Sequence, residues 1–116
     1  MSAILVSMDD KYLYLNNWLH GDMRQYDISD PHKPKLTGQV WMGGLLGKAP
    51  VVNGVKIAGG PQMYQLSLDG KRMYVTTSLF STWDNQFYPE IRTQGGAMIM
   101  IDCDVENGGM KINKDF

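Results

Sequence analysis

Two histidines and one cysteine are the side chains of this sequence best suited to bind a transition metal or to act as a nucleophile. His20 directly precedes Gly21, where a residue without a side chain lets a ligand approach the backbone closely. A loop histidine hydrogen-bonded to Asp22 or to a carbonyl is the alternative, and spacing alone favours it. His32 lies between two prolines and is expected to be a solvated turn residue.

Sulfur chemistry is the second possibility that the sequence raises. Cys103 lies between Asp102 and Asp104, and acidic neighbours raise the pKa of a thiol, so it is a poor nucleophile. Several methionines lie in or beside expected strands, where filling of a flexible core explains them better than a copper–thioether site. They are Met8, Met63, Met73, Met98 and Met100.

No spacing along the chain completes a metal site around His20. A second histidine, cysteine or carboxylate at ligand spacing is missing, so further ligands must come from elsewhere. The sequence also contains no glycine-rich phosphate loop and no Gly-x-Ser-x-Gly nucleophile elbow.

A repeated segment organises the elements that must position these residues. Ser7–Tyr14 reads Ser-Met-Asp-Asp-Lys-Tyr-Leu-Tyr and Ser67–Tyr74 reads Ser-Leu-Asp-Gly-Lys-Arg-Met-Tyr, with Ser, Asp, Lys and the final Tyr at the same spacing. Asp-Asp and Asp-Gly tolerate the positive φ of a tight turn, so each copy predicts a hairpin. Gln25–Ile28 and Met100–Cys103 extend the repeat downstream.

Each repeat unit offers four short strands. The expected strands are Ile4–Ser7, Tyr12–Asn16, Met23–Ile28 and Leu36–Trp41, followed by Met63–Ser67, Arg72–Ser78, Ala97–Cys103 and Met110–Asn113. This pattern predicts an all-β fold that is part of a β-propeller, with about two four-stranded antiparallel blades. An eight-stranded barrel or sandwich with a chance turn repeat is the alternative.

The predicted domain limits follow from these strands. Residues 1–42 form the first blade, and residues 61–116 form the second blade with a long loop at 79–96. Residues 43–60 form a Gly-rich link, in which Asn53-Gly54 predicts a further hairpin.

Strand order sorts the connections of a four-stranded meander onto two opposite faces. The loop with His20, the 79–96 insert and the link are expected on one face. The two Asp turns and His32 are expected on the other. The first face is the one that can carry chemistry, because long loops rather than tight turns build sites.

Charge and length exclude several classes of function. A net charge of −1 attracts neither nucleic acid nor an anionic membrane, and no stretch approaches the length of a transmembrane helix. A single cysteine excludes an internal disulfide and fits a reducing compartment, so a cytoplasmic location is expected. Two blades leave open sheet edges, so the chain is expected to be a fragment that is marginal alone or self-associates.

The longest motifs resemble one known family. They are Asn17–Tyr26 (Asn-Trp-Leu-His-Gly-Asp-Met-Arg-Gln-Tyr), Gly59–Met63, Gln65–Arg72 and Trp83–Pro89. Together they resemble the selenium-binding protein family, whose members include methanethiol oxidase. The resemblance covers nearly the whole chain and corresponds to part of the C-terminal half of the longer family members. The link between Gly47 and Gly59 is shorter than in those relatives.

The resemblance implies a β-propeller and a copper-dependent oxidase that converts methanethiol, a small thiol, to formaldehyde, hydrogen sulfide and hydrogen peroxide. It makes His20, in the Trp-Leu-His-Gly-Asp motif, the candidate copper ligand, with the other ligands outside this chain and the catalytic residues unknown. The family's selenium-reactive cysteine lies in a region without a counterpart here, so Cys103 does not inherit that role. The chain by itself is expected to be inactive. The alternative is a non-catalytic selenium-binding propeller scaffold involved in protein transport, with protein partners on the loop face.

Overall fold

The computed structural model describes residues 3–45, 51, 52, 55–57, 59–78, 86–89 and 96–113. Its strands are β1 (Ala3–Val6), β2 (Tyr12–Asn17), β3 (Asp22–Asp27), β4 (Lys35–Trp41), β5 (Val51–Val52), β6 (Val55–Lys56), β7 (Tyr64–Leu66), β8 (Arg72–Thr76), β9 (Met98–Cys103) and β10 (Met110–Ile112). The described segments contain no helix long and apolar enough to cross a membrane.

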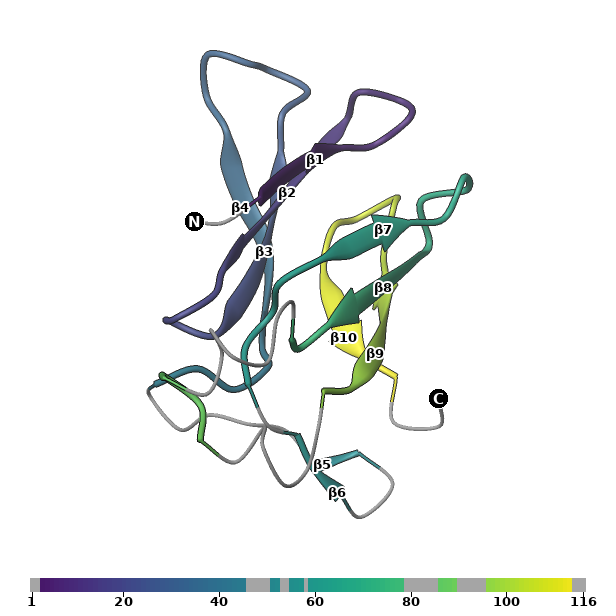
Figure 1. Ribbon diagram of the computed structural model, residues 1–116. Helices are drawn as coiled ribbons and strands as arrows, with labels where there is room; N and C mark the ends of the chain where they lie inside the picture. The colour runs from purple at the N-terminus through teal and green to yellow at the C-terminus, as the bar shows by residue number, and fades with distance from the viewer. Residues whose placement is uncertain are drawn as a thin grey trace.

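Two four-stranded antiparallel meanders form the body of the molecule. The first sheet has the order β1-β2-β3-β4 and the second the order β7-β8-β9-β10 (Figure 1). The predicted all-β class and the two four-stranded sheets are therefore confirmed, with strand ends within about three residues of those expected. Closure of such sheets into a propeller remains a prediction.

The repeat is the reason that both meanders begin in the same way. In each copy a serine hydroxyl donates to the aspartate Oδ1 two residues later, at 2.6 Å for both Ser7 and Ser67. The next lysine N–H also donates to that carboxylate, at 3.0 Å in each case. Asp10 has a φ of 59° and Gly70 a φ of 74°, so both turns use the left-handed region.

The larger of the two apolar clusters among the described residues lies between the two sheets. It consists of Tyr12, Tyr14, Met23, Val40, Met42, Ile57, Leu66, Met73, Val75, Ile99, Ile101 and Cys103. Burying an apolar side chain of this size stabilises a fold by about 1.5–3 kcal/mol, so these residues dominate the cohesion of the two sheets.

The prediction that the methionines fill the core is correct for Met73 and wrong for three others. Met73 is fully buried, but Met8, Met63 and Met98 are all more than half exposed. Met63 lies opposite Thr76, which pairs with Met98, so both methionines lie on the sheet face turned away from the core. Met8 lies in the first Asp turn. Strand alternation, rather than residue type, decides which methionine is buried.

Buried polar side chains hold the two sheets at a defined position. Asn16 is fully buried and donates to the carbonyl oxygen of Pro61 at 2.6 Å. Gln25, also fully buried, accepts a hydrogen bond from the N–H of Gly109 at 2.6 Å. Tyr64 donates to the carbonyl of Tyr14 at 3.2 Å. Each of these bonds joins the first sheet to a strand of the second sheet or to a segment that flanks one, so the two sheets cannot slide without breaking them.

The link between the meanders carries its own small hairpin. β5 and β6 pair in the register Val51 with Lys56 and Val52 with Val55, on either side of residues 53 and 54. This confirms the hairpin predicted there. Most of the predicted 79–96 loop lies outside the described residues, which include 86–89 and Gly96 from that range.

Candidate functional site

The loop that carries His20 joins β2 to β3 and is closed at its base by a buried carboxylate. Asp22 is fully buried and accepts hydrogen bonds from Asn17 Nδ2 at 2.9 Å, Arg24 Nε at 2.8 Å and Gln39 Nε2 at 2.6 Å. Burial alone would raise the pKa of Asp22, but these three donors outweigh it and lower the pKa below its ordinary value. The carboxylate therefore stays ionised and ties the two ends of the loop together.

Glycine backbone from the link packs directly on this loop. The N–H of Met42 donates to the Gly21 carbonyl at 2.7 Å, and the N–H of Leu45 donates to the Leu19 carbonyl at 2.8 Å. A Cβ added to Gly44 would lie 2.5 Å from the His20 carbonyl oxygen. Only glycine permits this approach, so the backbone of the histidine loop is fixed against the link.

Two aromatic residues of the 79–96 insert, Phe87 and Tyr88, pack against the same loop. The Tyr88 hydroxyl donates to the carbonyl oxygen of Trp18 at 2.5 Å. The Trp18 ring packs edge-on against Phe87 at 5.3 Å and against Tyr88 at 5.5 Å between ring centroids. A Cβ on Gly60 would collide with the Trp18 carbonyl, so the link closes on this cluster as well.

These contacts confirm that the His20 loop, the link and the insert lie at one end of the two sheets. In Figure 1 this is the lower end, where the β2–β3 connection lies near the link. The Asp turns lie at the upper end. We call these the loop end and the turn end.

His20 is exposed, and its imidazole lies against one aromatic ring. The centroid of the imidazole is 4.9 Å from that of Trp41, with the two planes inclined by 46°. Trp41 is the last residue of β4 and pairs with Asp22 in the ladder. The structure thus presents a solvent-accessible nitrogen ligand on a fixed backbone beside an indole.

The described residues of the loop end could supply one ligand of a copper site, the imidazole of His20. Imidazole nitrogen suits copper, and His20 is accessible. Within the described ranges, no group of three His, Cys, Asp or Glu side chains could hold a metal ion. The predicted role of His20 as a metal ligand stays a prediction, and the remaining ligands would have to come from residues outside those described.

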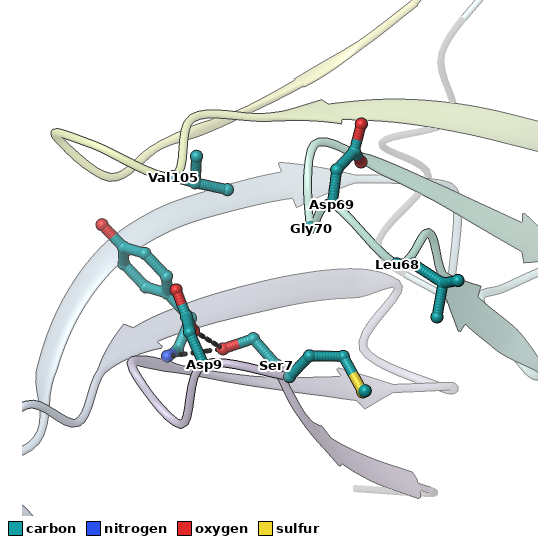
Figure 2. Close-up of a pocket in the computed structure, with 8 residues that line it drawn as sticks. Ser7, Asp9, Leu68, Asp69, Gly70 and Val105 are labelled. Carbon is teal, nitrogen blue, oxygen red and sulfur yellow. Dashed lines mark hydrogen bonds between the residues drawn. The ribbon is translucent and has the colours of Figure 1, made fainter.

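The turn end brings the two repeated turns together around a small hollow. It has a volume of about 100 Å³ and is lined from the first turn by Ser7 and Asp9 and from the second by Asp69 and Gly70 (Figure 2). Both carboxylates have a pKa lowered chiefly by the hydroxyl of the serine two residues earlier. These carboxylates are engaged in holding their own turns.

The other two candidates of the sequence lie away from the loop end. His32 is exposed in the β3–β4 turn, where its backbone N–H donates to Asp30 Oδ1 at 3.0 Å. Cys103 is buried, and burial raises the pKa of its thiol to about 11, with a smaller contribution from Asp102. The expected inertness of the thiol thus arises mainly from desolvation rather than from acidic neighbours.

Two features of the loop end were not predicted from the sequence. One is the contact between His20, in the β2–β3 loop, and Trp41, at the end of β4. The other is the set of close backbone approaches at Gly21, Gly44 and Gly60. The excess of glycine in the link is the signal that could have indicated these approaches.

Comparison with known proteins places the whole chain in one group. The family described as 56kDa selenium binding protein (SBP56) matches residues 1–116. Human methanethiol oxidase is 52% identical over 133 aligned positions, which cover 100% of this chain and 28% of the relative. Selenium-binding protein 1 of Arabidopsis thaliana is 54% identical, covering 100% of this chain and 27% of the relative.

A solved structure agrees with the sequence matches. The X-ray structure of a hypothetical selenium-binding protein from Sulfolobus tokodaii superposes with a TM-score of 0.88 at 50% identity, covering 99% of this chain and 25% of that one. The chain thus spans about a quarter of the length of the relatives that it matches. The 133 aligned positions exceed the 116 residues of the chain, so the human protein has residues within the matched region that this chain lacks.

The match runs through both meanders, the link and the motif around His20 without leaving any part of the chain aside. The chain belongs to the 56 kDa selenium-binding protein family.

Proposed function

We propose that this chain forms two blades of a propeller in a protein with methanethiol oxidase activity, and that His20 contributes one copper ligand at its loop end. The observation that carries the proposal is the 52% identity to human methanethiol oxidase over the whole chain, which includes an accessible His20. Imidazole is a common ligand of redox-active copper.

The reaction assigned by this proposal oxidises methanethiol with dioxygen and water. One molecule of each gives formaldehyde, hydrogen sulfide and hydrogen peroxide, so the thiol carbon is oxidised and dioxygen is reduced by two electrons. Bound copper would supply the one-electron chemistry that lets dioxygen react with a thiol. The residues of this chain would hold His20 in place through Asp22 and the link glycines.

The chain alone should not catalyse this reaction. His20 offers one ligand, whereas copper sites in proteins use three or four. The cytoplasmic location belongs to the same proposal and rests on the single cysteine, whereas protein partners on the loop face belong to the scaffold alternative.

A chimera provides the test. The matched segment of human methanethiol oxidase is replaced by these 116 residues, and the His20→Asn variant is compared with His32→Asn at the turn end. We expect the His20 variant to lose bound copper and thiol-dependent hydrogen peroxide release, while the His32 variant keeps both. Full retention of both properties by the His20 variant would refute the assigned role.

The relatives named selenium-binding proteins support a second candidate, a non-catalytic scaffold that binds selenium species. Metal analysis separates the two candidates. If neither the human protein nor the chimera holds copper after purification from copper-supplemented cells, the scaffold is favoured and the oxidase assignment falls.

A further inference from the structure

The backbone and the side chain of His20 are held in different ways. The backbone lies between a buried carboxylate at the base of the loop and the glycine link, with the Gly21 N–H donating to the Asn17 carbonyl at 2.7 Å. The side chain extends from this fixed backbone and is exposed to solvent. Its two rotatable bonds therefore decide where the ring nitrogens point.

Trp41 is placed to restrict those two bonds. Its half-buried ring lies 4.9 Å from the imidazole centroid at the end of β4, a strand pinned to β3 through the pair of Trp41 with Asp22. The tilt of 46° gives contact over part of the indole face. The indole ring of Trp41 excludes those His20 rotamers that would place the imidazole in the space that the indole occupies.

The aromatic cluster of Trp18, Phe87 and Tyr88 supports the backbone of the loop rather than the imidazole ring. Trp18 and Tyr88 are buried and support the loop from below, so their substitution would move the backbone as well as the ring. Trp41 touches the imidazole itself. It can be changed while the backbone hydrogen bonds of the loop are left in place.

We propose that Trp41 is a positioning residue, which holds the His20 imidazole in the orientation that ligates a copper ion. This inference rests on the proposed function for its copper, but the ring contact itself can be tested without metal. An imidazole already held in one orientation loses less conformational entropy when it binds, so removing the indole weakens binding without removing a ligand.

The contact is tested first by nuclear magnetic resonance on the 116-residue chain, under conditions in which dispersed amide signals show that the chain is folded. A proton above an aromatic ring is shifted upfield, so the His20 imidazole signals should lie upfield of those of His32, which serves as an internal reference. Trp41→Leu should move the His20 signals alone toward the reference, and Trp41→Phe should retain most of the shift. Equal His20 and His32 shifts in the unsubstituted chain, or His20 signals unmoved by Trp41→Leu, would overturn the contact.

Copper retention in the chimera tests the consequence. We expect Trp41→Leu to weaken copper retention about tenfold against a competing chelator, with Trp41→Phe restoring most of it and with the thermal midpoint unchanged. A loss of copper that Trp41→Phe fails to restore, or that only follows a lowered thermal midpoint, would show a structural role and overturn the proposal. If Trp41→Leu does not fold, copper retention by Trp41→Phe is compared with that of the unsubstituted chimera. A loss of copper retention above about threefold in Trp41→Phe would then contradict the positioning role of Trp41.

The His20→Asn variant keeps the two hypotheses separate. If copper is retained without His20, the proposed function fails whatever Trp41 does. If copper is lost with His20→Asn but retained in full with Trp41→Leu, the proposed function stands and the positioning role of Trp41 fails.

Discussion

The two ends of the paired sheets are built by different means. At the turn end, two copies of one Ser-x-Asp turn repeat the same hydrogen bonds with nearly the same distances. At the loop end nothing repeats: an exposed histidine in the first meander corresponds to a long aromatic insert in the second. The turn end is thus built from one repeated local motif, whereas the candidate site lies at the end that does not repeat.

The two ends also differ in how far apart along the sequence the contacting residues lie. The turns are stabilised locally, within five residues of sequence. The loop end depends on backbone approaches between segments about 20 to 40 residues apart, such as those of Gly44 to His20 and Gly60 to Trp18.

A pair of glycines with the same backbone angle gives the largest expected contrast between the two ends. Gly43 at the loop end has a φ of 126° and Gly109 at the turn end a φ of 125°. A Cβ on Gly43 would collide with the Gly59 carbonyl, whereas a Cβ on Gly109 meets nothing within 4 Å. We expect Gly43→Ala to cost about 2–4 kcal/mol of unfolding free energy and Gly109→Ala about 1–2 kcal/mol.

Urea denaturation of the two variants measures this contrast. Equal losses would mean that backbone strain alone accounts for both glycines, and the close approach of Gly43 to Gly59 within the link would then contribute nothing.

Loss of the buried hydrogen bonds of Gln25, one of which joins the two meanders, should give the next largest effect. Its Oε1 accepts from Thr37 at 2.7 Å and from the Gly109 N–H, and its Nε2 donates to the Tyr14 hydroxyl at 3.0 Å. Gln25→Ala leaves these buried groups without their partner, so we expect a loss of about 2–3 kcal/mol. The exposed Gln65 provides the control, and Gln65→Ala should change stability by less than about 0.5 kcal/mol. Similar midpoints for both variants in thermal unfolding would contradict this.

A smaller effect should distinguish the two copies of the turn. Ser7 is 8% exposed and Ser67 is half-buried, although both make the same bonds. Since an unsatisfied polar group costs more when it is buried, Ser7→Ala should lose about 1–2 kcal/mol and Ser67→Ala about 0.5–1 kcal/mol. Chemical denaturation of each variant checks the order, and a larger loss at Ser67 would reverse the interpretation.

The smallest expected effect is a pH dependence at the turn end. The pKa values of Asp9 and Asp69 are lowered by their serine hydroxyls, so both carboxylates bind protons less readily in the folded chain than in the unfolded chain. Their contribution to stability is present above about pH 4, the ordinary carboxyl range, and is lost as the pH falls through the lowered values.

Removing both hydroxyls should flatten this profile. The double variant Ser7→Ala, Ser67→Ala should lose less stability between pH 5 and pH 2 than the unsubstituted chain when unfolding is followed at a series of pH values. An unchanged slope would show that other groups cause the acid sensitivity.

Much of the fold could be read from local patterns. The repeated Ser-x-Asp turns, the alternation of the strands and the Asn53-Gly54 signal correctly predicted two meanders and the additional hairpin. The meander order also correctly separated His20 from His32. These features depend on sequence neighbours, which is why one sequence was enough.

The content of the core was less predictable. Met63 and Met98 are apolar and lie in or beside strands, yet they face away from the core, while Met23 and Met42 are fully buried. The sequence does not state which face of each sheet meets the other sheet. That choice depends on how the two meanders pack, and it inverts the burial of every second residue.

The sequence by itself determined the two meanders, the turns that start them and the end of the molecule on which His20 lies, because turn chemistry and strand order act over short distances. Only the tertiary structure placed Trp41 against His20 and brought the link glycines onto the histidine loop. Those contacts join the β2–β3 loop to the end of β4 and to the link that follows it, and they depend on how the link folds back onto the loop rather than on any local preference.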